Sequence, residues 1–336
     1  MTTAHHHGTT AHDTTATAHG APSGSAPAHD AALSFSGSGV LATFQAGVAH
    51  FIARRIGPLH DGVQLLGTSG GAIVAVLLGC GYDFSGWVGV ADAQIRQVRA
   101  AAPGPLGLLH FGGINLAHMA SILPPDAHAR CSGRVAISTT RLHLRRPCRR
   151  PTCLRTLRQA VLPPWRNARL DAFRSREELL GAVALSSHAP GLYGAPGTAS
   201  ALPRFRGGDV GLDGGLTDNA PLLRLRCARC GSGDVLLEED GGGGAARTLT
   251  VSPIDPSADV HGAPELRWFH VLQLAGAERL QFMFDLGWRR AEAAEGLIRR
   301  KLLLGPRGAP PCPRCAERAT TTGSRARRDN APASKL

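Results

Sequence analysis

The amino-acid sequence predicts an α/β layered domain, in which helices cover a β-sheet. Strand and helix signals alternate between residues 32 and 224, which is the pattern of this fold class. Two of the strand signals run into helix signals through short glycine-rich turns, at residues 37–39 and 67–71. With 336 residues and a hydrophobic fraction of 43%, the chain can bury a sizeable core for one main domain plus additional segments.

The first glycine-rich turn follows a predicted strand at residues 32–36. Apolar residues then recur at spacings of three and four from Leu41 onwards, which predicts a helix. Backbone N–H groups in such a turn can donate hydrogen bonds to an oxygen that becomes negatively charged during a reaction. We therefore expect Gly37, Ser38 and Gly39 to form an oxyanion hole.

The second glycine-rich turn holds Ser69 at its centre, between an apolar run at 63–66 and a helix-like run at 72–78. A strand, a sharp turn and a helix with a serine at the tip expose the hydroxyl and place helix N–H groups beneath it. The tight turn needs small residues, which Gly67 and Gly71 supply. Ser69 is therefore the candidate nucleophile of this nucleophile elbow.

A third glycine-rich stretch begins with Asp213, Gly214 and Gly215. An acid at such a turn can approach another loop closely. Asp-Gly is also a common turn pair, so this stretch by itself favours an aspartate that only stabilises a turn.

These three glycine-rich motifs, in this order, resemble the patatin-like phospholipase family, whose members work with a Ser–Asp dyad and no histidine. Further stretches at 123–128, 132–141 and 173–179 resemble the branch that contains adipose triglyceride lipase and adiponutrin. The resemblance extends from about residue 32 to about residue 253. It implies a three-layer α/β/α fold with a mostly parallel central sheet.

The resemblance also implies the roles of the motif residues. Ser69 would be the nucleophile and Asp213 its general base, with an acyl-enzyme as the intermediate. Gly214 and Gly215 would shape the acid loop, and no cofactor would be needed. One departure is Ala42, because the oxyanion motif of the family usually closes with glycine.

The activity that the resemblance implies is hydrolysis of acyl esters, with acylglycerols as the first substrate class, as in a triacylglycerol lipase. A phospholipase A and a lipid transacylase use the same dyad, so both remain open. A non-catalytic lipid-binding protein is the alternative of another class, and Ala42 is its only support in the sequence. A Ser–His–Asp triad is a weaker alternative, because His261 and His270 follow Asp213 but lie in no recognisable motif.

Composition and resemblance together divide the chain into four parts. These are a low-complexity tail at 1–30 that we expect to be disordered, a catalytic domain at 31–255, a helical extension at 256–304 and a basic disordered tail at 305–336. Residues 145–170 and 224–247 are expected to be insertions relative to the family branch.

The helical extension is expected to contain a helix from Glu278 to about Leu304, with an apolar stripe and several basic residues. The stripe favours packing on the catalytic domain, and a helix that lies on a membrane or lipid droplet is the other interpretation. No run of eighteen apolar residues occurs in the chain, so the sequence predicts no transmembrane helix.

The charge of the chain indicates its class of partner. The formal net charge is +12, and nearly all of the basic residues are arginines. Aromatic residues make up 5% of the chain and do not alternate with a basic face, which argues against nucleic-acid binding. A positive surface suits an anionic lipid interface. We expect the partner to be lipid at a membrane or lipid-droplet surface, and a protein co-activator remains open.

Two C-x-x-C pairs, Cys227 with Cys230 and Cys312 with Cys315, could together hold a structural zinc ion. The pairs lie far apart and outside the strongest family match, so reduced thiols or a loose redox pair are favoured. No catalytic metal is expected, because a Ser–Asp dyad requires none.

The chain ends in Ser334-Lys335-Leu336, which matches a peroxisomal targeting signal. No signal peptide is visible in the sequence, so we expect an intracellular protein. The peroxisome is one expected location, and a lipid-droplet or membrane surface is the other.

Overall fold

The structure is a computed structural model, which describes the part of the chain that forms the sheet and its helices. The described residues are 29–102, 104–142, 165–189, 204–205, 209–223 and 247–303. Both C-x-x-C pairs, the C-terminal tripeptide and most of the two expected insertions lie outside these residues.

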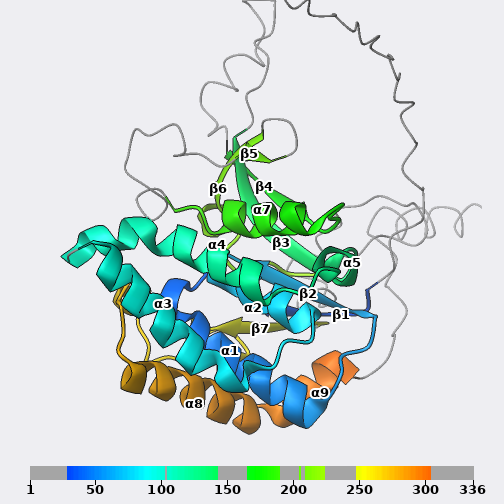
Figure 1. Ribbon diagram of the computed structural model, residues 1–336. Helices are drawn as coiled ribbons and strands as arrows, with labels where there is room; N and C mark the ends of the chain where they lie inside the picture. The colour runs from blue at the N-terminus through cyan, green and yellow to red at the C-terminus, as the bar shows by residue number, and fades with distance from the viewer. Residues whose placement is uncertain are drawn as a thin grey trace, which may run out of the picture.

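Eight described strands form one mixed sheet at the centre of the fold (Figure 1). They are β1 (Ala31–Phe35), β2 (Val63–Thr68), β3 (Val135–Leu142), β4 (Trp165–Leu170), β5 (Arg204–Phe205), β6 (Asp209–Asp213), β7 (Thr248–Ser252) and β8 (Val260–His261). The order is β5-β6-β3-β2-β1-β7-β8, with β4 also paired to β3. The five strands β3, β2, β1, β7 and β8 run parallel, whereas β4, β5 and β6 form antiparallel pairs.

Helices flank this sheet, which confirms the predicted α/β class with a mostly parallel sheet. The described α-helices are α1 (Ala42–Phe51), α2 (Gly70–Gly79), α3 (Trp87–Ala101), α4 (Phe111–Ile122), α5 (Ala127–Cys131), α7 (Arg176–Ser186), α8 (Ala277–Ala293) and α9 (Glu295–Leu303). In Figure 1, α1, α2 and α7 lie directly over the strands, and α8 runs along the outer side of α1.

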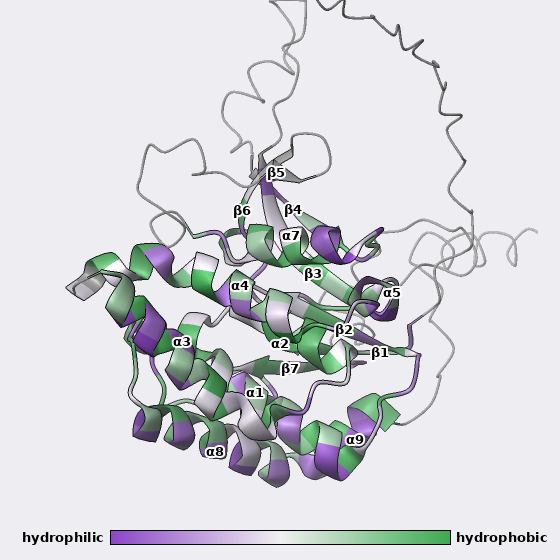
Figure 2. Cartoon of the chain, in the orientation of Figure 1, coloured by the Kyte–Doolittle hydropathy of each residue, from purple (hydrophilic) through white to green (hydrophobic). Residues whose placement is uncertain are grey.

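The apolar core lies mainly on one face of the sheet. Alternate residues of a strand point to opposite faces. Leu33 and Phe35 of β1 therefore join a large cluster shared with the helices, while Ala32 joins a small cluster on the other face. The other described members of that small cluster are Leu66, Ala136 and Leu223. Helix α8 also has an apolar side and a polar side. Figure 2 shows that it is hydrophilic along the edge that faces away from α1.

Strand β3 pairs with three other strands, β2, β4 and β6. Its residues from Ile137 to Leu142 pair with β4 along one edge, so part of the insertion expected at 145–170 is a strand of the sheet. Both β2 and β6 must therefore pair along the opposite edge of β3. Strand β2 takes the first half of that edge and runs parallel, while β6 takes the second half and runs antiparallel. The C-terminal ends of β2 and β6 consequently meet head to head.

The helix expected from Glu278 to Leu304 is two helices, because the chain leaves helical geometry at Ala294 between α8 and α9. The break lets Ile298 and Leu302 of α9 reach the core beside β1 and β7. The buried residues of α8 pack against α1, as the favoured interpretation predicted. In the ranges that the structure describes, no helix is long and apolar enough to span a bilayer.

Two glycines allow α1 and α8 to pack closely. Gly47 of α1 lies against the backbone carbonyl of Phe284, and Gly287 of α8 lies against the backbone carbonyl of Phe44. A side chain at either position would collide with backbone atoms, which cannot move aside as a flexible side chain can.

We expect Gly47→Ala to lower the free energy of unfolding by about 1–3 kcal/mol, because the new methyl group would force α8 away from α1. Gly89→Ala is the matched control, since Gly89 lies on the exposed side of α3 with no heavy atom within 4 Å of its Cβ position. The control should stabilise the protein by about 0.5–1 kcal/mol. Urea unfolding measures both variants, and equal midpoints would contradict the close packing of the two helices.

Candidate active site

Ser69 lies at the tip of a sharp turn between β2 and α2. Its backbone angles are φ 53° and ψ −125°, and among the described residues it is the only non-glycine with a positive φ. A side chain at Gly71 would collide with the Phe35 carbonyl oxygen, and one at Gly67 would come within 2.6 Å of the Ala72 Cα. The turn is therefore tight for steric reasons, and it raises Ser69 above the end of the sheet.

The backbone N–H of Ser69 is held by a residue that sequence analysis missed. It donates a hydrogen bond of 2.9 Å to Ser186 Oγ at the end of α7. The Ser186 hydroxyl donates in turn to the Ser138 carbonyl of β3, at 2.6 Å. Ser186 thus fixes the elbow to the central strand. A serine at the end of a helix carries no sequence signal for this role.

Asp213 is the last residue of β6, and the sheet brings it beside Ser69. Thr68 pairs with Ser138 of β3, and Asp213 pairs with the next residue, Thr139. The Ser69 hydroxyl lies close enough to the Asp213 carboxylate to lower the pKa of that carboxyl. Two residues that are 144 apart in the sequence (213 minus 69) therefore lie side by side.

Burial raises the pKa of Asp213 above the ordinary value for an aspartate. Three groups oppose this effect by stabilising the charged form. They are the Ser69 hydroxyl, the Gly215 N–H, which donates to Asp213 Oδ1 at 2.8 Å, and the neighbouring imidazole of His188. The carboxylate is thus a stronger base than an exposed aspartate would be, and it is directed at the Ser69 hydroxyl.

The acid loop is bound to the strands β2, β3 and β4. The carbonyl oxygen of Asp218 accepts hydrogen bonds from Thr68 Oγ1 at 3.0 Å and from Ser138 Oγ at 3.3 Å. The Asp218 carboxylate forms an ion pair of 3.0 Å with Arg169 of β4. Gly214 packs directly against the Ser138 carbonyl. Asp218 therefore orders the loop, and its carboxylate is engaged by Arg169.

The turn at 37–39 lies next to the elbow. The Gly37 N–H donates to the Asn219 carbonyl at 3.0 Å, so this group is already engaged. No hydrogen bond between described residues uses the N–H groups of Ser38, Gly39 or Gly70. These three are the donors available to an oxyanion beside Ser69, and Gly39 supports the turn with a φ of 53°.

Gln45 of α1 stiffens this turn and was missed by sequence analysis. Its side-chain N–H donates to the Ser36 carbonyl at 2.8 Å, and its side-chain oxygen accepts from Ser38 Oγ at 3.0 Å. Ala42, the departure from the family motif, has φ −53° and ψ −22°, which alanine adopts without strain. Its methyl group faces the adjoining cavity.

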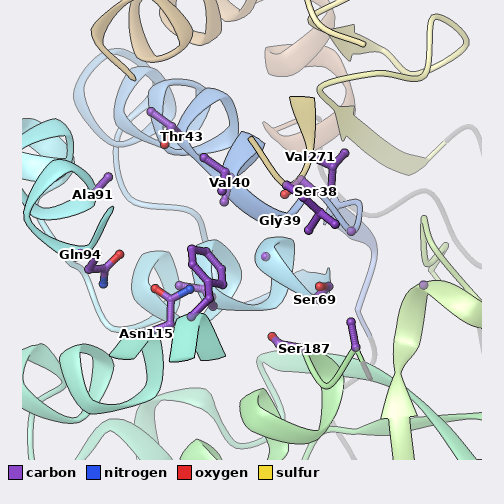
Figure 3. Close-up of a pocket in the computed structure, with 18 of the residues that line it drawn as sticks. Ser38, Gly39, Val40, Thr43, Ser69, Ala91, Gln94, Asn115, Ser187 and Val271 are labelled. Atoms are coloured by element: carbon purple, nitrogen blue, oxygen red, sulfur yellow. The ribbon is translucent and has the colours of Figure 1, made fainter. Parts of the chain in front are cut away.

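A cavity of about 300 Å³ lies beside Ser69 and Asp213. Ser69 and Asp213 both line it, and most of its wall is apolar. The larger apolar lining residues are Val40, Ile73, Trp87, Ile95, Phe111, Val271, Leu272 and Leu280. Figure 3 shows Ser69 on one side of the cavity, close to Ser38 and Gly39, and Gln94 on the other side. Such a space accommodates an acyl chain better than a polar substrate.

The histidines considered for a triad lie elsewhere. His261 bonds the Ala263 carbonyl at 3.2 Å, and His270 accepts from the Arg267 N–H at 3.1 Å. No described histidine lines the cavity. In the described ranges, no three metal-binding side chains gather in one place.

The fold and the site together define an α/β protein in which a serine on a sharp strand-to-helix turn lies beside a half-buried aspartate. The patatin-like phospholipase family model matches residues 33–226. The chain belongs to this family, whose members are in general serine lipid hydrolases and transacylases.

Curated relatives are similar at a distance. The omega-hydroxyceramide transacylase of Mus musculus is 27% identical over 56% of this chain and 28% of its own length. The patatin-like phospholipase domain-containing protein 2 of Rattus norvegicus is 28% identical over 78% of this chain and 45% of its own length. The patatin-like phospholipase domain-containing protein 5 of Homo sapiens is 27% identical over 68% of this chain and 43% of its own length. The chain thus spans less than half the length of these relatives.

Among solved structures, the chain is similar to VipD from Legionella pneumophila. The sequence identity is 14%, the TM-score is 0.29, and the match covers 59% of this chain and 48% of VipD.

The positive φ of Ser69 predicts stored backbone strain that a glycine would relieve. Ser69→Gly and Ser69→Ala both remove the hydroxyl, but only glycine adopts this conformation without a clash of its Cβ. We expect the glycine variant to be more stable than the alanine variant by about 1 kcal/mol, as measured by thermal unfolding. An alanine variant that unfolds at the same or a higher temperature would contradict a strained elbow.

Proposed function

We propose that this chain is a serine acyl-ester hydrolase that releases fatty acids from lipids, with acylglycerols as its main substrates. The observation that carries the proposal is that Ser69 and the half-buried Asp213 lie side by side at the wall of an apolar cavity. Membership of a family of lipid hydrolases and transacylases supports the same reaction class.

Acylation of the serine would be the first step. The Asp213 carboxylate accepts the proton of the Ser69 hydroxyl while Oγ forms a bond to the ester carbonyl carbon. The carbonyl oxygen becomes an oxyanion, and the N–H groups of Ser38, Gly39 and Gly70 donate to it. When the C–O bond of the ester breaks, Asp213 returns the proton to the departing alcohol. The acyl group stays on Ser69.

Deacylation would follow by the same route with water. Asp213 removes a proton from a water molecule as the water oxygen attacks the acyl carbon. The tetrahedral intermediate breaks its bond to Ser69, and the proton moves from Asp213 to the serine oxygen. A fatty acid leaves, and the free enzyme is restored.

The apolar cavity supports a lipid acyl group as the part of the substrate that is recognised. Acylglycerols come first because the sequence resembles the branch of the family that contains adipose triglyceride lipase. Phospholipids are the next class, since their acyl esters present the same carbonyl and chain.

Acyl transfer between lipids is the second candidate function. The similarity to the omega-hydroxyceramide transacylase of mouse favours it. The acyl-enzyme on Ser69 would be the same, and a lipid hydroxyl would take the place of water. The balance between the two reactions depends on whether the cavity admits a second lipid alcohol.

We expect Ser69→Ala and Asp213→Asn each to lower fatty-acid release from emulsified triacylglycerol at least about a thousand-fold, because each removes a partner of the dyad. Release from phosphatidylcholine, measured alongside, shows which lipid class is preferred. Product analysis with an added lipid alcohol separates hydrolysis from acyl transfer.

Ser121→Ala is the matched control, because Ser121 is an exposed serine of α4 whose hydroxyl donates to the His118 carbonyl of the same helix. It should keep its activity. A wild-type protein that a fluorophosphonate probe fails to label would argue against the enzyme and for a non-catalytic lipid-binding protein.

The raised pKa of Asp213 predicts a pH dependence. The carboxylate must be ionised to accept the proton, so kcat/KM should fall as the pH falls through this pKa. Because burial raises the pKa, the fall should occur at a higher pH than for an exposed aspartate. Hydrolysis of a soluble short-chain ester measures the profile without the complication of a lipid surface. Full activity down to the ordinary pKa range of aspartate would contradict Asp213 as the buried base.

A further inference from the structure

Large apolar side chains are exposed in one short segment after β8. Trp268 is 76% exposed, Phe269 is 53% exposed and Leu272 is 47% exposed. Folded proteins expose isolated apolar residues routinely, but adjacent exposed aromatic residues usually mark a surface that another molecule covers. The described part of this protein concentrates its exposed aromatic area here, which identifies the segment 268–272 as an interaction surface.

The segment 268–272 forms one border of the cavity. Val271 and Leu272 line the cavity, whereas Trp268 and Phe269 of the same segment face solvent. Figure 3 shows Val271 next to Ser38 and Gly39. The segment therefore contacts the substrate space with one end and water with the other.

The segment 268–272 is ordered and is fixed to the predicted oxyanion turn. Residues 268–270 form a short 3-10 helix, and the Val271 N–H donates to the Trp268 carbonyl at 3.1 Å. The Val40 N–H donates to the Val271 carbonyl at 3.0 Å. The exposed aromatic side chains thus project from a segment that is hydrogen-bonded to the turn beside Ser69, and a molecule that binds them is brought directly to that turn.

The acid loop also presents an exposed apolar residue beside the cavity. Gly215 lines the cavity, and the next residue, Leu216, is 65% exposed. Two loops that border the cavity, far apart in the sequence, therefore each present apolar side chains to solvent.

Two arginine residues carry positive charge close to the segment 268–272. Arg267, immediately before it, is exposed, and Arg279 stacks over the Phe282 ring at 4.8 Å. Burial lowers the pKa of His270, and the charges of Arg279 and Arg267 lower that pKa further. The acidic neighbour Glu265 is already paired with Arg290 at 2.9 Å. Arg267 and Arg279 therefore place positive charge beside the segment.

We propose that Trp268, Phe269 and Leu272, together with Leu216, are the surface by which this protein docks on a phospholipid membrane with anionic headgroups. Tryptophan and phenylalanine next to arginine suit the boundary between headgroups and acyl chains. Docking there would let a lipid acyl chain pass from the membrane into the cavity without crossing water. The assignment of a lipid partner rests on the proposed function, but the docking surface is tested without any catalysis.

Vesicle flotation of the full chain carrying Ser69→Ala tests the proposal, because this background cannot consume the vesicles. We expect it to float with phosphatidylcholine vesicles that contain phosphatidylserine. Adding Trp268→Ser and Phe269→Ser should reduce binding at least about tenfold, since each substitution removes an aromatic side chain that would enter the membrane. Binding to vesicles of phosphatidylcholine alone should be weaker, and added salt should weaken binding to the anionic vesicles.

Leu303→Ser on the same background is the matched control, because Leu303 is an exposed leucine of α9 that does not line the cavity. It should bind like its parent. Equal flotation of the Trp268→Ser/Phe269→Ser protein and its parent would overturn the proposal, and so would flotation that the Leu303→Ser control loses to the same degree. Equal binding to neutral and anionic vesicles would overturn the choice of an anionic membrane.

Kinetics separate this proposal from the proposed function. With Ser69 intact, Trp268→Ser/Phe269→Ser should hydrolyse vesicle lipid at least about tenfold more slowly, yet hydrolyse a soluble short-chain ester at the parental rate. An equal loss on both substrates, with unchanged thermal unfolding, would overturn the docking role. A wild-type protein that hydrolyses neither substrate but floats through Trp268 and Phe269 would refute the proposed enzyme and leave the docking surface standing.

Discussion

The arrangement of the site depends on the register of one strand, β3. Because β4 occupies one edge of β3, strands β2 and β6 share the other edge and meet end to end. Their last residues, Thr68 and Asp213, pair with the adjacent residues Ser138 and Thr139. A shift of one residue in either pairing would turn the end of that strand to the opposite face of the sheet. Ser69 follows one strand end and Asp213 forms the other, so the backbone hydrogen bonds of the sheet set the distance between the serine and the carboxylate.

Around this contact, the protein uses energetically unfavourable features that the rest of the fold stabilises. Ser69 has a backbone conformation that favours glycine, and Asp213 is a carboxylate in a site where burial disfavours its charge. Ser186 holds the elbow through the Ser138 carbonyl, and Thr68 with Ser138 holds the acid loop through the Asp218 carbonyl. Both sets of hydrogen bonds end on β2 or β3. The stability of the central sheet therefore offsets the unfavourable free energy of the backbone strain at Ser69 and of the desolvation of Asp213.

The cavity links this rigid centre to the outer surface. Its wall combines α2 with α3, α4 and the segment that follows β8, which come from four different parts of the chain. Val271 lies where these regions meet, since its carbonyl binds the turn at Val40 and its side chain borders the space for substrate. The exposed Trp268 and Phe269 precede Val271 in the same short segment. Surface, cavity and reacting groups therefore form one continuous path.

The sequence by itself determined the α/β class, the elbow at Ser69, the turn at 37–39 and the pairing of Ser69 with Asp213 through family resemblance. These features could be predicted because a tight turn requires glycine at fixed positions, and such local steric needs are visible in the chain. Only the tertiary structure decided which N–H groups stay available, since the engagement of Gly37 by Asn219 and the support from Ser186 and Gln45 depend on distant partners. It also decided that the predicted C-terminal helix is two helices and that the apolar residues of α3 and α4 line a cavity. The reason is physical: an apolar periodicity records that a face is shielded from water, but it does not specify the partner that shields it.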